Sequence, residues 1–390
     1  RVSHAAVRRY AVDEKLALLV NDVIGETVET IKKNEGINKP FCPNNYLYLT
    51  MYNILASSAF GRRYQMDDPE FLRIKYINEE QQKIGGYVFV AEFIPILRFI
   101  VKKKIDLMNQ GFEEFMNILK EKYLSHKKDY QDGYIRDFTD ALINAKIDSE
   151  KNEKEAAPYL TDNNLALTLS DLFSAGSDTS QFTLRWILLL MANHPEMQSK
   201  MRKEVDEQIG DRIPVQNDKQ NCHYVNAFIS ECLRYKIIVP LSVPHKTICD
   251  VEIRKFNCLN LVFNVLFILG GYKIPKDTTV SLHTYAIMHN PNVFEDPETF
   301  KPERFLESNG SYVSSRPNGF IPFGMGRRVC LGEKLALADM FLIVVNLLQR
   351  TSGYEFALPN GPGTANLTPD PNKGGNCMPL NYKILLQNTI

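Results

Sequence analysis

The amino-acid sequence predicts a mainly α-helical protein with a few small β-sheets. Apolar residues recur every three to four positions along most of the 390-residue chain, which is typical of helices that bury one face. The longest single helical pattern covers residues 161–193, and further patterns lie within 1–61, 71–123, 195–210, 225–235 and 333–349. Short segments with turn residues, at 272–282 and 367–386, predict the small β-regions, the second of them a closing hairpin.

Charge and cysteine usage exclude several classes of protein. Forty-six basic residues balance 46 acidic ones, whereas nucleic-acid-binding proteins usually carry a basic excess, so we expect no nucleic-acid partner. The seven cysteines are scattered without a Cys-x-x-Cys pair, which argues for a reducing compartment and against a disulfide framework or a zinc site. The chain opens on Arg1 without a signal peptide or an apolar span. We therefore expect a fragment whose N-terminal part, with any membrane anchor, is missing.

Residues 71–123 predict two helices around an apolar hinge at 93–100, where Pro95 interrupts the helical pattern. Three lysines, 102–104, follow directly. Apolar residues beside a lysine run are compatible with a segment that rests on a membrane surface, and equally with a core segment flanked by solvated charges. Farther along, the charged stretch 150–157 lacks large apolar side chains and predicts a surface loop.

The helix predicted over 161–193 is apolar nearly all round, which indicates that it is buried. Thr161 or Asp162 can cap its N-terminus, and Pro195 opens the next helix. Its middle, 175–180, is unusual because it contains a glycine, an aspartate and several hydroxyl residues. Glycine costs about 1 kcal/mol there relative to alanine, and a buried aspartate is costly unless it is paired. Such conflicts are typical of functional sites, although a packing glycine and a threonine bonded back to its own helix would also explain them.

Two neighbouring segments carry weaker patterns. In the helix predicted at 225–235, Glu231 and Arg234 share a face, which by itself usually means an exposed ion pair of little energetic weight. The following stretch, 237–245, contains two prolines that disfavour helix, so we expect it to be extended.

The most distinctive stretch is the cysteine loop, residues 323–332, which reads Phe-Gly-Met-Gly-Arg-Arg-Val-Cys-Leu-Gly. Its glycines allow the backbone to approach a flat ligand closely, and its arginines can bind anionic groups. Cys330 precedes the helix predicted at 333–349, and helix N-terminal N–H groups lower the pKa of a thiol. The loop can therefore present a thiolate, backbone donors and a cation to one ligand. A single cysteine beside a glycine turn would more often be buried and inert.

This loop resembles the haem-binding loop of the cytochromes P450, the haem-thiolate monooxygenases, at five defining positions: Phe323, Gly326, Arg328, Cys330 and Gly332. The resemblance covers essentially the whole chain and is most specific over 161–386. It implies a single cytochrome P450 domain over 1–390, incomplete at the N-terminus. It also implies haem b (iron protoporphyrin IX) as the cofactor, with Cys330 as the axial ligand of the iron. The other four positions would contact the haem, and His245 would bind a haem propionate.

For the long helix, the resemblance implies a face that handles oxygen. Gly176 would make room for dioxygen, Thr179 would donate a hydrogen bond to the bound oxygen species, and Asp178 would help to deliver protons. Apolar or small side chains would line a substrate pocket, namely Phe173, Ala175, Val239, Leu241, Val243 and Cys377.

The resemblance also assigns a structural role to three charged residues. Glu231 and Arg234 would join Arg304, from the Pro-Glu-Arg-Phe segment at 302–305, in a buried cluster that keeps the loop under the haem in place.

The implied function is insertion of one oxygen atom of O2 into an apolar small molecule such as a steroid, fatty acid or xenobiotic. The cysteine loop and the stretch 244–247 (Pro-His-Lys-Thr) look like the microsomal animal branch of the family. That branch implies NADPH–cytochrome P450 reductase as the electron donor, cytochrome b5 as a second partner, and the cytoplasmic face of the endoplasmic reticulum membrane. Arg327 and Lys334 are either docking residues for an acidic partner or ordinary surface charges. Two alternatives stay open: a haem-thiolate isomerase that needs no reductase, and an inactive truncated product.

One stretch departs from the family pattern. Residues 255–270, rich in Phe, Asn and Leu, separate two segments that the family joins directly. The stretch is too short for a transmembrane helix, which needs about 20 apolar residues. We predict a short intron translated in frame, because residues 254–255 and 269–270 are compatible with splice-site codons. A genuine insertion that touches a membrane is the alternative.

Overall fold

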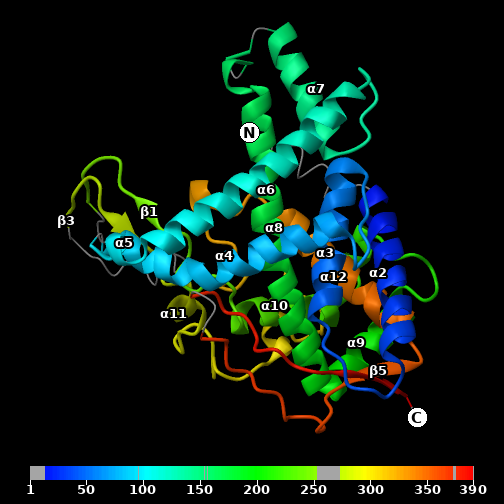
Figure 1. The fold of residues 1–390 in the computed structure, drawn as a ribbon. Coiled ribbons are helices and arrows are strands. Elements are labelled where there is room, and N and C mark those ends of the chain that lie inside the picture. The colour runs from blue at the N-terminus through cyan, green and yellow to red at the C-terminus, as the bar shows by residue number, and fades with distance from the viewer. Residues whose placement is uncertain are drawn as a thin grey trace.

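The computed structural model describes residues 14–94, 96–152, 154–155, 157–252, 273–371 and 375–389. Within these ranges the protein is mainly helical, and its β-structure consists of small antiparallel sheets, as the sequence predicts (Figure 1). The predicted hinge residue Pro95 and the predicted insertion at 255–270 lie outside the described residues.

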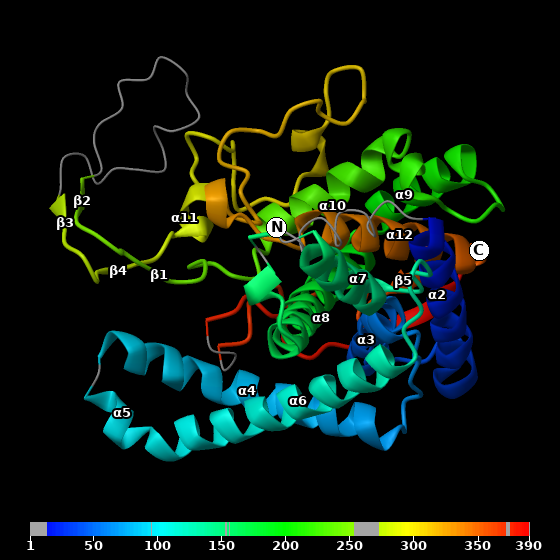
Figure 2. The same ribbon diagram turned by 90° about the horizontal axis from the view of Figure 1, so that it is seen from above.

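The N-terminal half of the described chain is a series of helices: α2 (Glu14–Glu35), α3 (Asn44–Phe60), α4 (Pro69–Phe93), α5 (Leu97–Ile100), α6 (Lys102–Lys128) and α7 (Phe138–Lys151). The helices α4 and α6 lie side by side and form an arm with α5 at its tip (Figure 2). Asp68 caps α4 by accepting hydrogen bonds from the N–H groups of Glu70 and Phe71, at 2.9 and 3.3 Å. The sequence interpretation missed α7, whose last turn includes residues 150–151 of the predicted surface loop.

The later helices are α8 (Asp162–Asn193), α9 (Pro195–Gln208), α10 (His223–Tyr235), α11 (Thr284–Met288) and α12 (Glu333–Arg350). The predicted bounds of the long helix are confirmed, and Thr161 caps α8 by accepting a hydrogen bond from the N–H of Asn164 at 3.2 Å. The N-terminal half of α8 packs in one hydrophobic core with α3, α4, α6 and α7. Its C-terminal half packs in a second core with α2, α10 and α12. The middle of α8 therefore lies where the two cores meet.

Three pairs of short strands complete the fold: β1 (His245–Lys246) with β4 (Thr279–Val280), β2 (Val251–Glu252) with β3 (Lys273–Ile274), and β5 (Tyr354–Ala357) with β6 (Leu385–Asn388). Inside the predicted hairpin at 367–386, the described residues form one antiparallel bridge, between Pro369 and Pro379. The prediction is wrong for residues 385 and 386, which belong to β6 and pair with β5. Proline has no N–H to donate to a strand ladder, which limits the pairing around this bridge.

No helix in the described ranges combines the length and apolar character needed to cross a membrane.

Candidate functional site

The cysteine loop forms a tight arc immediately before α12. Gly324 and Gly326 have φ angles of +75° and +73°, which residues with a side chain rarely adopt. The N–H of Cys330 donates a hydrogen bond to the carbonyl of Phe323 at 2.9 Å, which ties the two ends of the arc together. A side chain added at either glycine would meet nothing within 4 Å, so the backbone here borders open space.

Cys330 is an exposed residue at the end of this arc, although the surrounding protein covers part of its sulfur. Its pKa is raised above the ordinary value, mainly because surrounding protein displaces water from the sulfur. Hydrogen bonds from the N–H groups of Gly332 and Glu333 act in the opposite direction, as the position before a helix predicts. Because burial outweighs these donors, the protein alone favours the thiol. A metal ion bound at sulfur would supply the charge that holds the thiolate.

The groups around the thiol fit a flat, mainly apolar ligand that carries anionic substituents. Arg328 lies in a short 3-10 turn, η4 (Gly326–Arg328), and its side chain is exposed. Its guanidinium has no hydrogen-bond or ion-pair partner among the described residues, so it is available to a carboxylate. Leu331 beside the thiol is 38% exposed and adds an apolar side chain to this face. A haem offers this combination of an apolar plane, a metal and propionates.

His245 lies in β1 opposite Val280, and its side chain is exposed. Two apolar residues shortly before His245 are more exposed than core residues. Leu241 is 37% exposed and Val243 is 70% exposed. Val239 is only partly exposed and packs against the second core. Two of the three residues of this segment that are predicted to line the substrate pocket are therefore exposed.

One face of α8 carries a stripe of exposed residues in its middle, including Ala175 and Thr179, although the C-terminal part of the helix is buried. The hydroxyl of Thr179 donates a hydrogen bond to the carbonyl of Ala175 at 2.6 Å. A hydroxyl has one proton, so Thr179 can accept, but not donate, a second hydrogen bond in this conformation. The neighbouring Asp178 accepts a hydrogen bond from Nε2 of Gln82 on α4 at 3.0 Å.

Two predicted site residues on α8 have close neighbours from α3. A side chain added at Gly176 would meet Leu55 of α3 at 3.5 Å. Phe173 is 2% exposed and packs between Phe60 and Tyr52 in the core. The roles of Gly176 beside dioxygen and of Phe173 in a substrate pocket stay predictions.

Cys377 is buried, and backbone contacts hold it beside the segment that precedes β1. Its N–H donates to the carbonyl of Ile238 at 2.9 Å, and its carbonyl accepts from the indole N–H of Trp186 at 2.8 Å. The structure therefore brings Cys377 close to Val239, its predicted neighbour in the pocket.

The three charged residues of the predicted brace meet in the interior. Arg234 donates two hydrogen bonds to the carboxylate of Glu231, each at 2.7 Å, and both side chains are fully buried. Nε of Arg304 donates to the same carboxylate at 3.3 Å. Arg234 also donates to the carbonyls of Met288 and Pro297, at 3.0 and 2.9 Å. The cluster thus joins α10 to the irregular segment that leads to the cysteine loop.

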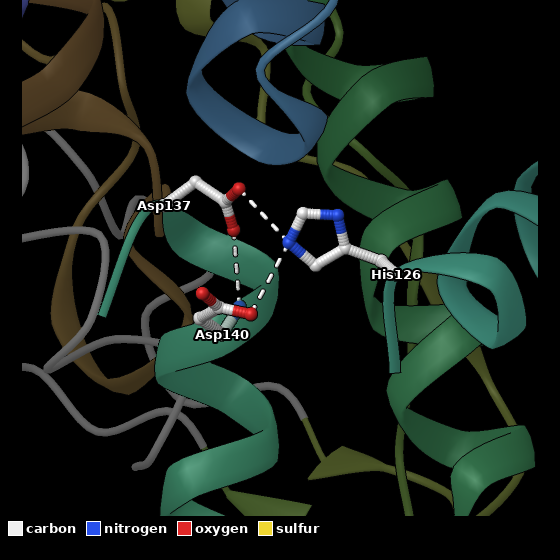
Figure 3. Close-up of side chains that lie close together, drawn as sticks. All are labelled: His126, Asp137 and Asp140. Atoms are coloured by element: carbon white, nitrogen blue, oxygen red, sulfur yellow. Dashed lines mark hydrogen bonds and ion pairs between the residues drawn. The ribbon is translucent and has the colours of Figure 1, made fainter. Parts of the chain in front are cut away.

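A second charged cluster, which the sequence interpretation missed, lies between the end of α6 and the start of α7 (Figure 3). Nε2 of His126 lies 2.9 Å from Asp137 and 3.2 Å from Asp140. Arg136 also binds Asp140, through Nε at 2.7 Å and Nη2 at 2.9 Å. Asp137 in addition caps α7 by accepting from the N–H of Asp140. These interactions already supply both carboxylates with donors, so the cluster is accounted for as a brace between two helices.

Gln82 is the other residue near the site that the sequence interpretation missed. It lies on α4, far from α8 in the chain, and nothing in its local pattern distinguishes it from other polar residues of that helix.

The chain is similar in sequence to several known proteins. A steroid 17-alpha-hydroxylase/17,20 lyase from Squalus acanthias is 32% identical over 341 residues, which are 86% of this chain and 62% of that protein. Cytochrome P450 1A1 from Rattus norvegicus is 33% identical over 311 residues, 80% of this chain and 56% of that protein. Cytochrome P450 2D3 from the same organism is 33% identical over 366 residues, 93% of this chain and 68% of that protein.

The chain thus spans between 56% and 68% of the length of these three relatives. The model of the family described as cytochrome P450 matches residues 1–259 and 262–385. A match over nearly the whole chain, together with the helical fold and the glycine arc that presents Cys330, shows that this chain belongs to the cytochrome P450 family.

Proposed function

We propose that the protein is a haem-dependent monooxygenase that inserts one oxygen atom of O2 into an apolar small molecule. The observation that carries this proposal is the position of Cys330, an exposed residue at the end of the glycine arc. Membership in the family implies a haem-iron cofactor. The shark relative is named as a steroid hydroxylase, so a steroid is one candidate substrate, beside a fatty acid or a xenobiotic.

Haem b is the form of the cofactor that we propose, with Cys330 as the axial ligand of its iron. Arg328 and His245 would bind the propionates, and Phe323, Gly326 and Gly332 would border the porphyrin. When bound, the haem supplies the oxidising chemistry, with a thiolate ligand that favours cleavage of the O–O bond.

Asp178 and Thr179 of α8 would deliver protons from the side of the haem opposite Cys330. The carboxylate of Asp178 is held at the helix surface by its hydrogen bond from Gln82. Rotation of the Thr179 side chain would release its proton from the carbonyl of Ala175 and direct it to the open face. Ala175, Leu241 and Val243 would bind an apolar substrate and exclude water.

Electrons would come from NADPH through NADPH–cytochrome P450 reductase, with cytochrome b5 as a second donor. Arg327 and Lys334 are exposed near Cys330 and offer positive charge to an acidic partner. We place the protein at the cytoplasmic face of the endoplasmic reticulum membrane, because its cysteine loop and the stretch 244–247 resemble the microsomal animal branch of the family.

A haem-thiolate isomerase that needs no reductase is the second candidate. One observation favours it: the proton of Thr179 is committed to its own helix in this conformation. Product formation from an apolar substrate that requires both NADPH and the reductase would favour the monooxygenase. Rearrangement of a peroxide substrate without them would favour the isomerase.

The carbon monoxide difference spectrum of the reduced protein tests the haem-thiolate site itself. We expect the red-shifted Soret band of thiolate-ligated haem in the wild type and its loss in Cys330→Ser. The matched control is Cys42→Ser, because Cys42 is also exposed but lies far from the cysteine loop in the chain. Failure of the wild type to bind haem would contradict the proposal and favour an inactive product. A Cys330→Ser spectrum identical to that of the wild type would contradict the assigned ligand.

A further inference from the structure

A small cavity of about 190 Å³ lies behind the cysteine loop. Its walls come from α10, from the segment at 312–320 and from the start of α12, and Phe323 of the cysteine loop contributes to it. Lys219, in the short 3-10 helix η2 (Gln216–Gln220), and Arg316 line the same cavity. The volume is sufficient for several water molecules or for a small polar ligand.

Lys219 is a poorly compensated positive charge at this cavity. Its side chain is partly buried, and its ammonium has no hydrogen-bond or ion-pair partner in the part of the chain that the structure describes. Burial is the main cause that lowers the pKa of Lys219, to about 8. The positive charge of Arg316 also lowers this pKa, whereas the carboxylate of Glu333 raises it. An anion in the cavity would relieve both the desolvation and the repulsion.

The carboxylates beside these two cations are already engaged. Glu333 forms an ion pair with Nη1 of Arg316, which leaves the other N–H groups of that guanidinium for a second acceptor. The carboxylate of Asp218, next to Lys219, accepts two hydrogen bonds from Arg212. Nη1 donates to one oxygen at 2.8 Å, and Nη2 donates to the other. The charges of Lys219, Arg316 and Glu333 therefore sum to one excess positive charge at the cavity.

Two hydroxyl groups add a neutral donor to the same wall. The oxygens of Ser230 and Tyr312 lie 2.7 Å apart, and either can donate to the other. Each hydroxyl has one proton, so their mutual hydrogen bond uses one and leaves one for a ligand. The cavity thus combines an ammonium, part of a guanidinium and one hydroxyl donor.

We infer that this cavity binds a small tetrahedral oxyanion, of the phosphate or sulfate type, between Lys219 and Arg316. Charge-assisted hydrogen bonds from the ammonium and the guanidinium would hold two oxygens, and the Ser230–Tyr312 pair would donate to a third. Because Phe323 forms part of the wall, a bound anion is expected to stabilise the cysteine loop. This site is distinct from the proposed oxygenation chemistry, and its occupancy can be measured without turnover.

Titration calorimetry with sulfate tests the site on the haem-bound full chain, at an ionic strength held constant with chloride. We expect one sulfate per chain in the wild type, an affinity lower by about tenfold or more in Lys219→Met, and retention in Lys219→Arg. The matched control is Lys203→Met, which removes the same charge from an exposed lysine on α9. If Lys219→Met does not fold, Arg316→Gln serves as the second variant.

The pH dependence of sulfate binding is a second measurement, because the charge of sulfate is constant from neutral to mildly alkaline pH. The charged groups that act on Lys219 are Arg316 and Glu333. We expect affinity in the wild type to fall as the pH rises above about 8, where Lys219 loses its proton. The Lys219→Arg variant should not show this fall.

Competition with adenosine monophosphate distinguishes two sources of the anion, the phosphate group of a nucleotide and a free oxyanion. Displacement of sulfate identifies a nucleotide phosphate as an accepted ligand, and lack of displacement restricts the cavity to free oxyanions. The inference is overturned if the wild type binds no sulfate, if Lys219→Met binds it as the wild type does, or if Lys203→Met loses as much affinity as Lys219→Met.

Discussion

At the scale of single residues, Asp339 is a buried carboxyl group outside the site. It lies in α12 and is 2% exposed, and its Oδ1 has no hydrogen-bond partner among the described residues. Burial raises the pKa of Asp339 to about 8, whereas an aspartate in an unfolded chain has a pKa of about 3.9. The folded protein therefore holds this carboxyl in its protonated form at neutral pH.

The sign of the pH dependence follows from this difference in pKa. Between pH of about 4 and 8 the unfolded chain has released the proton and the folded chain has not. Folding takes up a proton in that window, so the contribution of Asp339 lowers the free energy of unfolding as pH rises. The slope approaches about 1.4 kcal/mol per pH unit for a single group.

We predict that Asp339→Asn removes this slope and stabilises the protein most at the alkaline end of the window. The amide has a similar shape and does not ionise. Denaturant unfolding of the wild type and the variant, measured at a series of pH values, checks this expectation. Parallel curves for the two proteins would show that Asp339 is not the group that takes up the proton.

At the scale of elements, the cluster of Glu231, Arg234 and Arg304 joins α10 to η3 (Pro302–Phe305). Glu231 also accepts a hydrogen bond from the N–H of Lys301 at 2.9 Å. Its charge is therefore compensated from two elements that are far apart in the chain. Loss of either arginine should act on the docking of the irregular segment and not on α10 alone.

We predict that Arg234→Met destabilises the protein by about 3–5 kcal/mol, because it leaves the buried carboxylate of Glu231 without its main partner. Arg304→Met should cost less, since Arg234 would still donate both of its hydrogen bonds to Glu231. Denaturant unfolding, followed by far-ultraviolet circular dichroism, compares the two variants. An equal cost for both would mean that the cluster does not depend on the bidentate pair.

The contact between α4 and α8 is the other element-scale feature with a functional consequence. Gln82 reaches across from the arm to Asp178 in the middle of α8. We predict that Gln82→Leu lowers the turnover number by about tenfold and leaves KM nearly unchanged, because proton delivery and not substrate binding is affected.

The matched control for Gln82→Leu is Gln81→Leu. Gln81 is equally part-buried on the same helix, and its amide has no hydrogen-bond partner among the described residues. Steady-state kinetics with reductase and NADPH measure both variants. Equal effects of the two substitutions would assign the loss to α4 packing and not to Asp178.

At the scale of the whole molecule, the arm of α4 and α6 ends in α5 (Figure 2). An apolar tip, defined here as Ile94, Ile96, Phe99 and Ile100, lies in and just before this helix. Ile96, Phe99 and Ile100 are 69%, 84% and 77% exposed. Lys102 and Lys103 follow and are exposed as well. Of the two sequence interpretations of this segment, a buried core segment is therefore wrong, and a surface that contacts a membrane remains the prediction.

We predict that the double substitution Phe99→Glu and Ile100→Glu weakens binding to anionic lipid vesicles by at least about tenfold. Each large apolar side chain moved out of water contributes about 1.5–3 kcal/mol, and about 1.4 kcal/mol corresponds to a factor of ten. Vesicle co-sedimentation measures the effect, with Tyr159→Glu as the control, because Tyr159 is 73% exposed elsewhere on the surface. Equal binding of the double variant and the wild type would show that the tip does not contact lipid.

The sequence was most informative where a local pattern decides the local structure. Apolar periodicity and a threonine cap determine α8, and the glycines of the cysteine loop determine an arc with left-handed backbone before α12. The pair Glu231 and Arg234 is also adjacent on one helix turn, so its contact is determined within α10. These features depend on residues within a few positions of one another.

Contacts between distant segments were decided only by the tertiary structure. The packing of α3 against α8 decides that Leu55 lies beside Gly176 and that Phe173 is buried among aromatic side chains. The packing of α4 against α8 decides that Gln82 donates to Asp178. The same holds for β6, which pairs with β5 although 27 residues separate the two strands in the chain. The local turn pattern before β6 did not reveal this partner. The physical reason is that packing between elements sets the environment of a side chain. The sequence pattern of a helix predicts which face is apolar, but it does not predict which other element packs against that face.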